Sequence, residues 1–300
     1  MRRPASTMSP AHAPRPGPTR IDEWLAAAAA LLAPVHTAAR LETEVLLAHV
    51  LQRPRSHLRA FPERALSPGE ANGFLGLVER RRRGEPIAYL TGAREFWSLP
   101  LRVTPDTLIP RPETERLVEL ALEHLPGDDA AWVADLGTGA GPLALAMARE
   151  RPAAHVVATD TSAAALEVAR GNAARLGLGN VEFRRGDWCR ALGPDERYAV
   201  MVSNPPYVPA GDPHLGRGDV RFEPRGALAA GPDGLDAIRR IAFAARHALA
   251  PGGWLLLEHG YDQAPAVRRL LMRCGYRAIT THEDLAAHPR VTQAQRAGSP

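Results

Sequence analysis

The chain has 300 residues, enough for two domains of ordinary size, and 45% of its residues are apolar, as in a globular protein. All 37 basic residues are arginine, which excludes P-loop and Schiff-base lysines, and the formal charge of +4 is only weak support for an anionic partner. The two cysteines, Cys189 and Cys274, are too far apart for a zinc or disulfide framework, and no apolar run is long enough to span a membrane, so we expect a metal-free cytoplasmic protein.

The first part of the chain predicts a disordered tail followed by a small helical domain. Residues 1–18 hold five prolines among small and polar residues, a composition that cannot bury a core. Residues 19–84 show helical spacing of apolar side chains, and Ser67 with Glu70 three residues later is a capping box. The arginine run at 80–83 indicates a solvated helix end, or else contact with RNA or an acidic partner. The helices are expected at about 20–33, 38–51 and 67–83.

Residues 85–110 predict a β-hairpin linker, with two short strands around Gly92, and an arginine-containing loop follows at 108–115. From Ala131 onward, apolar runs alternate with helical patterns, which is typical of a parallel α/β sheet covered by helices. Strands are expected at about 132–137, 155–160, 181–188, 198–203 and 254–260, with closing strands from residue 276.

A glycine-rich turn, Gly137-Thr138-Gly139-Ala140-Gly141, follows the first of these strands. The dinucleotide fingerprint Gly-x-Gly-x-x-Gly fails in both registers, because its last position falls on Pro142 or on Ala144. The turn, with Asp135 before it, instead suits a nucleoside without phosphates whose amino-acid end needs close backbone approach and an acid for its ammonium group. S-adenosyl-L-methionine is such a ligand.

Three further residues complete the predicted cofactor site. Asp160 ends the second strand about 20 residues beyond the glycines, where an acid accepts the ribose hydroxyls. Asp187 and Trp188 leave the third strand where an adenine would lie, the acid for its amino group and the ring for its face. A capped turn over a core aromatic residue is the plainer interpretation of this pair.

Asn204-Pro205-Pro206-Tyr207 ends the fourth strand, because proline cannot donate to a sheet. The Asn204 oxygen and the Pro205 carbonyl can each accept a hydrogen bond from a planar NH₂ group, while the Tyr207 ring packs on its plane. A loop that only makes a turn is the alternative. The long segment 208–232 is expected to be a structureless lid, and Glu258 with His259 forms either a catalytic pair or a polar strand end.

With these motifs placed, the chain resembles the HemK-like family, the peptide chain release factor N5-glutamine methyltransferases. The resemblance covers most of residues 40–296 and combines the Asn-Pro-Pro-Tyr motif with stretches before and after it. Those stretches are 84–90, 95–101, 108–115 (Leu-Ile-Pro-Arg-Pro-Glu-Thr-Glu), 135–141, 219–224 (Asp-Val-Arg-Phe-Glu-Pro) and 257–260.

The resemblance implies a small all-α domain for substrate contact, a β-hairpin linker and, over 111–296, a Rossmann-like seven-stranded class I methyltransferase domain. It implies that residues 137–141, Asp160, Asp187, Trp188 and Asn204 bind S-adenosyl-L-methionine. Residues 204–207 would hold the glutamine of the Gly-Gly-Gln motif of a class I release factor. The expected partner is therefore that protein, with no stable nucleic acid and no membrane, and the enzyme is expected to be monomeric. Pro142 and the last eight residues depart from the family pattern.

Two alternatives stay open at the level of sequence. Asn-Pro-Pro-Tyr also serves methylation of exocyclic amines on nucleic acid bases, although base flipping normally needs a target-recognition region. The arginine run also fits a non-catalytic RNA- or ribosome-binding protein that keeps a methyltransferase fold.

Overall fold

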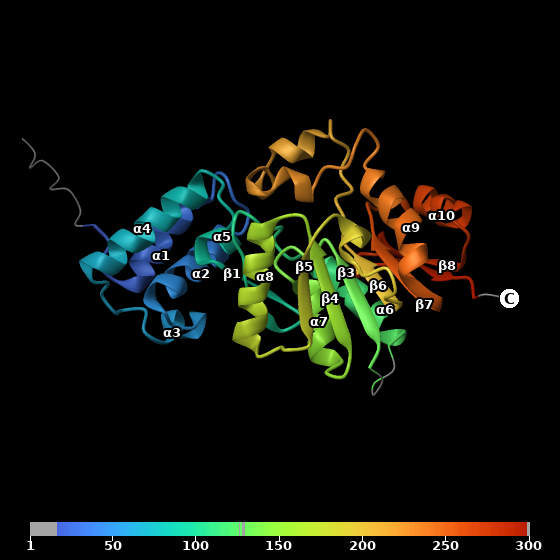
Figure 1. Cartoon of the computed structure of the whole chain (residues 1–300). Helices are drawn as coiled ribbons and strands as arrows, with labels where there is room; N and C mark the ends of the chain where they lie inside the picture. The colour runs from blue at the N-terminus through green and yellow to red at the C-terminus, as the bar shows by residue number, and fades with distance from the viewer. Residues whose placement is uncertain (1–16, 126, 128–129, 299–300) are drawn as a thin grey trace, which may run out of the picture. The chain divides into compact units, whose positions relative to one another are not determined.

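The computed structural model describes residues 17–125, 127 and 130–298. The chain divides into two compact units, residues 1–83 and 84–300 (Figure 1). The tail expected at residues 1–18 lies almost entirely outside the described residues.

The first unit is helical in its described part. Its helices are α1 (Ile21–Leu32), α2 (Ala39–Leu51), α3 (Arg55–Ala60) and α4 (Pro68–Arg82). The predicted capping box starts α4: the Glu70 N–H donates to Ser67 Oγ over 3.3 Å, and the Ser67 N–H donates to Glu70 Oε2 over 2.8 Å. Sequence analysis did not predict α3, because a six-residue helix is too short to show a clear period.

The arginine run at 80–83 was predicted to be a solvated helix end, but not all of its side chains are exposed. Arg81 is only 4% exposed, and its guanidinium donates to both carboxylate oxygens of Glu42, over 2.8 and 2.9 Å. Arg82 and Arg83 bond to Glu79 on the same helix. The helical repeat turns residue 81 towards α2, which the charge pattern alone could not reveal.

The second unit begins with a helix where a strand was expected. Residues 84–92 contain the short helix α5 (Ile87–Thr91), which starts after Pro86 and ends at Gly92 in the left-handed conformation. The hairpin follows as β1 (Ala93–Phe96) and β2 (Leu99–Arg102). Its two-residue turn is Trp97-Ser98, with φ of 52° and 56°, so the prediction of a turn around Gly92 was wrong.

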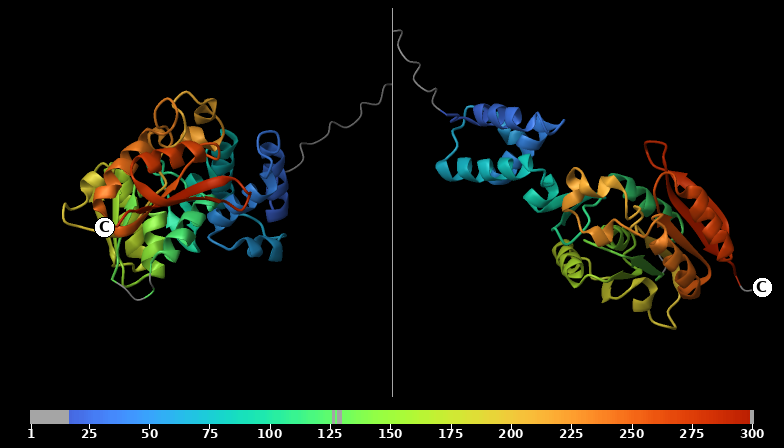
Figure 2. Two further views of the ribbon diagram at one scale, coloured as in Figure 1. Left: turned by 90° about the vertical axis from the view of Figure 1, so that its right-hand side faces the viewer. Right: turned by 90° about the horizontal axis from the view of Figure 1, so that it is seen from above.

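A seven-stranded sheet forms the centre of the second unit, in the order β5-β4-β3-β6-β7-β9-β8. Strands β3 to β7 are parallel, and β9 runs antiparallel to β7 and β8 (Figures 1 and 2). This confirms the predicted α/β class and seven strands. The bounds are β3 (Trp132–Leu136), β4 (His155–Asp160), β5 (Val181–Arg185), β6 (Tyr198–Ser203), β7 (Leu249–Glu258), β8 (Tyr276–Glu283) and β9 (Pro289–Arg296).

Helices cover both faces of the sheet, and successive strand residues alternate between the two cores. Val133 packs in the core with α6 (Glu115–Glu123) and α7 (Pro142–Glu150), whereas Ala134 packs in the core with α9 (Asp236–Ala248) and α10 (Ala264–Arg273). Helix α8 (Ala163–Leu176) packs along β5. With both faces buried, the polar ends of the strands are the part of the sheet that can reach a ligand.

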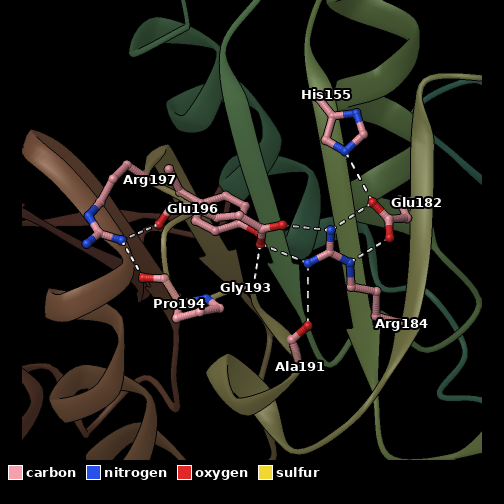
Figure 3. Close-up of polar contacts among 9 residues, drawn as sticks. His155, Glu182, Arg184, Ala191, Gly193, Pro194, Glu196 and Arg197 are labelled. Atoms are coloured by element: carbon pink, nitrogen blue, oxygen red, sulfur yellow. Dashed lines mark hydrogen bonds and ion pairs between the residues drawn. The ribbon is translucent and has the colours of Figure 1, made fainter.

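An ion-pair network ties the edge strand to the chain entering β6 (Figure 3). The Arg184 guanidinium bonds to Glu182 over 2.7 Å and to Glu196 over 2.8 Å, and the Tyr198 hydroxyl donates to Glu196 over 2.6 Å. Arg184 lowers the pKa of the Glu196 carboxyl to about 2. The network therefore ties β5 to the segment that enters β6, although β4 and β3 lie between these two strands in the sheet.

The segment expected to be a structureless lid contains three short 3-10 helices. They are η3 (Pro213–Gly216), η4 (Asp219–Phe222) and η5 (Arg225–Ala227). Backbone hydrogen bonds within each turn satisfy part of the segment's polar groups, so its polar composition did not mean absence of local structure.

Candidate active site

A cavity of about 610 Å³ lies at the carboxyl ends of the central strands, where ligands bind in open parallel sheets. Sequence-predicted residues from four separate segments line it. They are Gly137, Thr138, Gly139 and Ala140 after β3, Asp160 at the end of β4, Asp187 and Trp188 after β5, and Asn204 and Pro206 after β6.

The glycine turn brings its backbone against a tryptophan. Gly137 has φ of 79°, and a Cβ placed on it would lie 2.6 Å from Cζ3 of Trp188. Only glycine allows both the backbone conformation and this contact. The indole therefore forms a wall of the cavity beside the turn, and its contact with the face of an adenine stays a prediction.

Asp135 lies beneath the same turn with one oxygen unused. Its Oδ2 accepts from the Thr138 hydroxyl over 2.6 Å and from the Ala144 N–H over 3.1 Å. Its Oδ1 is buried and has no hydrogen-bond partner in the described chain. Burial raises the pKa of the carboxyl to about 7, against the stabilising effect of the Thr138 hydroxyl. A buried carboxylate oxygen without a partner suits a cationic group of a ligand.

Asp160 is held in place by two backbone donors. Its Oδ2 accepts from the Gly139 N–H over 2.9 Å, and its Oδ1 accepts from the Ser162 N–H over 2.8 Å. The carboxylate thus bridges the glycine turn and the start of α8. Each oxygen keeps a lone pair for a further donor, as ribose hydroxyls would require.

Asp187 has a partner that the sequence did not reveal. Its Oδ2 pairs with Arg240 of α9 and lies 3.8 Å from a nitrogen of Arg190. Both Asp187 and Arg240 line the cavity. The contact of Asp187 with an adenine amino group stays a prediction. Because of the ion pair, the carboxylate would then bind both Arg240 and the adenine amino group.

Asn204 lies between two cavities. Besides the large one, it lines a second cavity of about 210 Å³ together with Pro205 and Tyr207. Its Nδ2 donates to Thr114 Oγ1 over 3.1 Å, whereas its Oδ1 bonds to none of the residues that the structure describes. The Asn204 oxygen is therefore available as an acceptor, and the Pro205 carbonyl accepts no backbone hydrogen bond from the residues that the structure describes.

Tyr207 is fixed at both ends. Its hydroxyl donates to Glu258 Oε1 over 3.2 Å, and its carbonyl accepts from Gln263 Nε2 over 3.0 Å. Gly234, with φ of 75°, approaches so closely that a Cβ there would lie 2.2 Å from this carbonyl oxygen. Glu258 is fully buried, which raises the pKa of its carboxyl to about 7.

His259 does not belong to this site. Its Nε2 lies 2.8 Å from Thr292 Oγ1 on β9, and burial lowers the pKa of the imidazole. It lines neither of the two cavities. Of the pair proposed from sequence, Glu258 contacts a site residue and His259 supports the sheet.

A buried carboxylate joins two of the motifs that the sequence singled out. Glu223 Oε2 accepts from the Ile109 N–H over 3.0 Å, and Oε1 pairs with Arg111. The Glu223 side chain is completely buried. The Val-Arg-Phe-Glu-Pro segment and the arginine loop thus form one wall of the smaller cavity.

Two family models match the chain. The PrmC N-terminal domain matches residues 23–92, and the methyltransferase small domain matches residues 115–215. Among curated proteins, the chain is 51% identical to the release factor glutamine methyltransferase of Vibrio cholerae, over 85% of this chain and 89% of that protein. The chain belongs to the release factor glutamine methyltransferase family. The relative from Pseudomonas aeruginosa is 53% identical, and that from Escherichia coli 47%, with coverage of 87% and 84% of this chain and of 94% and 91% of the relatives.

Solved structures support the fold. A 16S rRNA N2-G1207 methyltransferase of Thermus thermophilus, in complex with AdoMet and guanosine, matches with a TM-score of 0.52 at 22% identity, over 68% of this chain and 49% of that one. A methyltransferase from Pyrococcus furiosus matches with a TM-score of 0.51 at 17% identity, over 73% and 97%. This family member therefore has the class I methyltransferase fold. No helix among the described residues is long and apolar enough to cross a membrane.

Sequence reasoning missed several side chains that contact the site of this glutamine methyltransferase family member. They are Thr114, Glu223, Arg240 and Gln263. Thr114 and Glu223 lie inside segments that the resemblance had marked, so those segments were the available signal. Arg240 and Gln263 sit on or beside helices with ordinary amphipathic patterns and gave no signal.

Proposed function

We propose that this enzyme transfers a methyl group from S-adenosyl-L-methionine to the side-chain amide nitrogen, N5, of the glutamine in the Gly-Gly-Gln motif of class I release factors. The observation that carries the proposal is the position of Asn204, which lines both cavities and has its amide oxygen unused beside the Pro205 carbonyl. One cavity accommodates the methyl donor and the other the amide.

The larger cavity fits S-adenosyl-L-methionine by its donor and acceptor set. The unpartnered Asp135 Oδ1 matches the ammonium group, the open glycine turn allows the methionine part to approach the backbone, and Asp160 matches the ribose hydroxyls. Trp188 and Asp187 lie beside the turn for the adenine. When bound, the cofactor supplies a methyl group on a sulfonium centre.

The chain's own residues act mainly by positioning. An amide nitrogen is a poor nucleophile, because its lone pair is delocalised into the carbonyl. Asn204 Oδ1 and the Pro205 carbonyl each accept one N–H of the glutamine, which fixes the amide plane and favours the nitrogen geometry needed for attack. Positioning of this kind contributes several kcal/mol, up to roughly 7–11 in the best intramolecular models. Tyr207 packs on the amide plane, and no strong general base is required, since the methylated nitrogen loses its proton to water.

The decisive experiment offers the enzyme a choice of substrates. Labelled S-adenosyl-L-methionine is incubated with purified release factor, total RNA and DNA, and the labelled product is digested. We expect label on the Gly-Gly-Gln peptide. Label confined to nucleic acid would support the base-methylating alternative and overturn the proposal.

Asn204→Ala tests the assigned roles. We expect kcat to fall by about 10²–10³, the loss typical of removing one positioned polar group that acts on the transition state. Cofactor affinity, measured by calorimetry, should change by less than about threefold, because Asn204 is not among the groups matched to the cofactor's charged ends. An equal loss of activity and cofactor affinity would contradict this division of roles.

We further propose that the enzyme works in the cytoplasm as a monomer, without stable nucleic acid, because its substrate is a protein of translation termination. Size-exclusion chromatography with light scattering tests the oligomeric state. A dimer or a persistent absorbance of bound nucleic acid would contradict this part of the proposal.

A further inference from the structure

The side chain of Gln263 connects three loops of the second unit. Gln263 directly precedes α10 and is only 9% exposed. Its Nε2 donates to the carbonyl of Tyr207 over 3.0 Å and to that of Asp233 over 3.2 Å, and its Oε1 accepts from the Gly260 N–H over 2.9 Å. These partners follow β6, precede α9 and follow β7, respectively. One amide thus holds chain segments that are far apart in the sequence.

The chemistry of these partners leaves the amide only one orientation. A carbonyl oxygen can only accept a hydrogen bond, and a backbone N–H can only donate one. The NH₂ group therefore has to face the two carbonyls, and the Oε1 atom has to face Gly260. A half-turn of the amide would set its oxygen against both carbonyls and its NH₂ group against the N–H, so all three hydrogen bonds would be lost.

The two carbonyls mark the ends of the segment 208–232. Tyr207 and Asp233 are the residues directly before and after it. The two ends also pair through the backbone, since the Val208 N–H donates to the Leu228 carbonyl over 2.9 Å. Residues of this segment line the smaller cavity. The side-chain amide therefore joins the base of the segment to the start of α10.

The Tyr207 carbonyl lies in a space that fits it closely. A Cβ on Gly234, which has φ of 75°, would lie 2.2 Å from this oxygen and 2.8 Å from Gln263 Nε2. At the other end of the residue, the ring hydroxyl donates to Glu258 Oε1 over 3.2 Å. Tyr207 lines the smaller cavity. The Gln263 bond therefore fixes the backbone end of the residue, and a shift there would move the ring relative to the substrate amide.

We infer that Gln263 is a positioning residue for methyl transfer: by holding the carbonyl of Tyr207, it fixes the ring that packs on the substrate amide. The inference rests on the proposed function and deepens it. Gln263 lines neither of the two cavities that contain the predicted site residues, so it acts through Tyr207 and not by touching the glutamine or the cofactor.

The first test changes the amide in two ways and measures kcat with purified release factor. Gln263→Met keeps the length of the side chain and removes all three hydrogen bonds. We expect kcat to fall by about 10- to 100-fold, the effect of displacing a positioned group by about 1 Å. Gln263→Glu keeps the acceptor for Gly260, but a carboxyl group has at most one proton to donate, so at least one carbonyl loses its donor. Here we expect at least about a fivefold fall.

Gln295→Glu is the matched control, because it makes the same chemical change away from the site. Gln295 Nε2 donates to the Gly252 carbonyl over 2.8 Å, near the start of β7 and not at its carboxyl end. We expect its kcat to stay within about threefold of the wild type. Melting temperatures, measured for every variant, give the folded fraction to which kcat is normalised.

A double variant shows whether Gln263 acts through Tyr207. Once Tyr207→Ala has removed the ring, the hydrogen bond to residue 207 no longer positions a group on the substrate amide. We therefore expect Gln263→Met combined with Tyr207→Ala to stay within about threefold of Tyr207→Ala alone. A residue with a merely structural role would lower kcat by the same factor in both backgrounds.

Gly234→Ala is an independent variant that leaves Gln263 in place. Its Cβ would push the same carbonyl away from its donor, so we expect kcat to fall, as in the Gln263 variants. This variant decides the matter if neither Gln263 variant folds, because wild-type kcat in it would show that the position of this carbonyl is unimportant.

Wild-type kcat in Gln263→Met would overturn the inference, as would an equal loss in Gln295→Glu or an equal factor with and without the Tyr207 ring. The wild-type enzyme separates this failure from that of the proposed function. If the wild type does not methylate release factor, the proposed function fails. If it does, and the Gln263 variants equal it, only the role of Gln263 fails.

Discussion

Replacing Glu223 with alanine removes the carboxylate that joins the segment 219–224 to the arginine loop. The Glu223 side chain is completely buried and Arg111 is 28% exposed, so the pair is only partly screened by water. Removing one partner of a buried pair costs about 3–5 kcal/mol, because the other partner is left without compensation. The Ile109 N–H, in a residue that is 5% exposed, also loses its acceptor. Since water can reach part of Arg111, we expect about 3 kcal/mol lower stability.

Urea unfolding followed by tryptophan fluorescence measures this change. Glu223→Gln keeps one acceptor and should cost about 1.5–3 kcal/mol, the value of a lost hydrogen bond to a charged group. Glu119→Ala is the matched control, since its pair with Arg116 lies on the surface of one helix with side chains 49% and 34% exposed. Such a surface pair contributes at most about 1 kcal/mol.

The same variants test whether the bridge shapes the smaller cavity. Val220 and Ala227 flank Glu223 in sequence and line that cavity, so detaching the segment should raise KM for release factor. The reasoning is refuted if Glu223→Ala loses no more stability than Glu119→Ala, or if KM for release factor stays unchanged.

Two further variants probe the cofactor side. Burial raises the pKa of Asp135 to about 7, so the folded chain binds more protons than the unfolded chain between about pH 4 and 7, and stability falls as pH rises through that range. The Asp135→Asn variant cannot ionise at this position, so we expect it to be more stable than the wild type at pH 8 by about 2–4 kcal/mol and to bind the cofactor more weakly. If the free energy of unfolding in urea depends on pH as it does in the wild type, this reasoning is wrong. Gly137→Ala places a Cβ 2.6 Å from Trp188, so we expect at least about tenfold weaker cofactor binding by calorimetry, and wild-type affinity would show that the indole can move aside at little cost.

Structural elements that depend on residues close together in the sequence were predicted well. The strands, the glycine turn and the proline stop after Ser203 follow from periodicity and backbone chemistry, and the sheet confirms the expected class. The error at residues 84–92 also arose from reliance on local pattern, because a short apolar run between glycines fits either a strand or a helix. In the structure the run is helical, beginning after Pro86 and ending at Gly92 in the left-handed conformation.

Contacts between distant segments could not be predicted in this way. Thr114 meets Asn204 across 90 residues, and Glu223 meets Arg111 across 112. No local pattern specifies such a pair, because it arises only when the loops are brought to the same edge of the sheet. The resemblance marked both segments, but the structure was needed to give each side chain its partner.

The position of Asn204 in the wall between two cavities has a consequence for inhibitor chemistry. The cavities of about 610 and 210 Å³ share Leu108, Arg111, Asn204 and Ala227. A bisubstrate compound that links an adenosine to a glutamine-like amide could fill both and cross the wall at Asn204. The smaller cavity would contribute the affinity for the amide end of such a compound, because Leu108, Arg111 and Val220, from the two segments that the Glu223–Arg111 pair joins, line it.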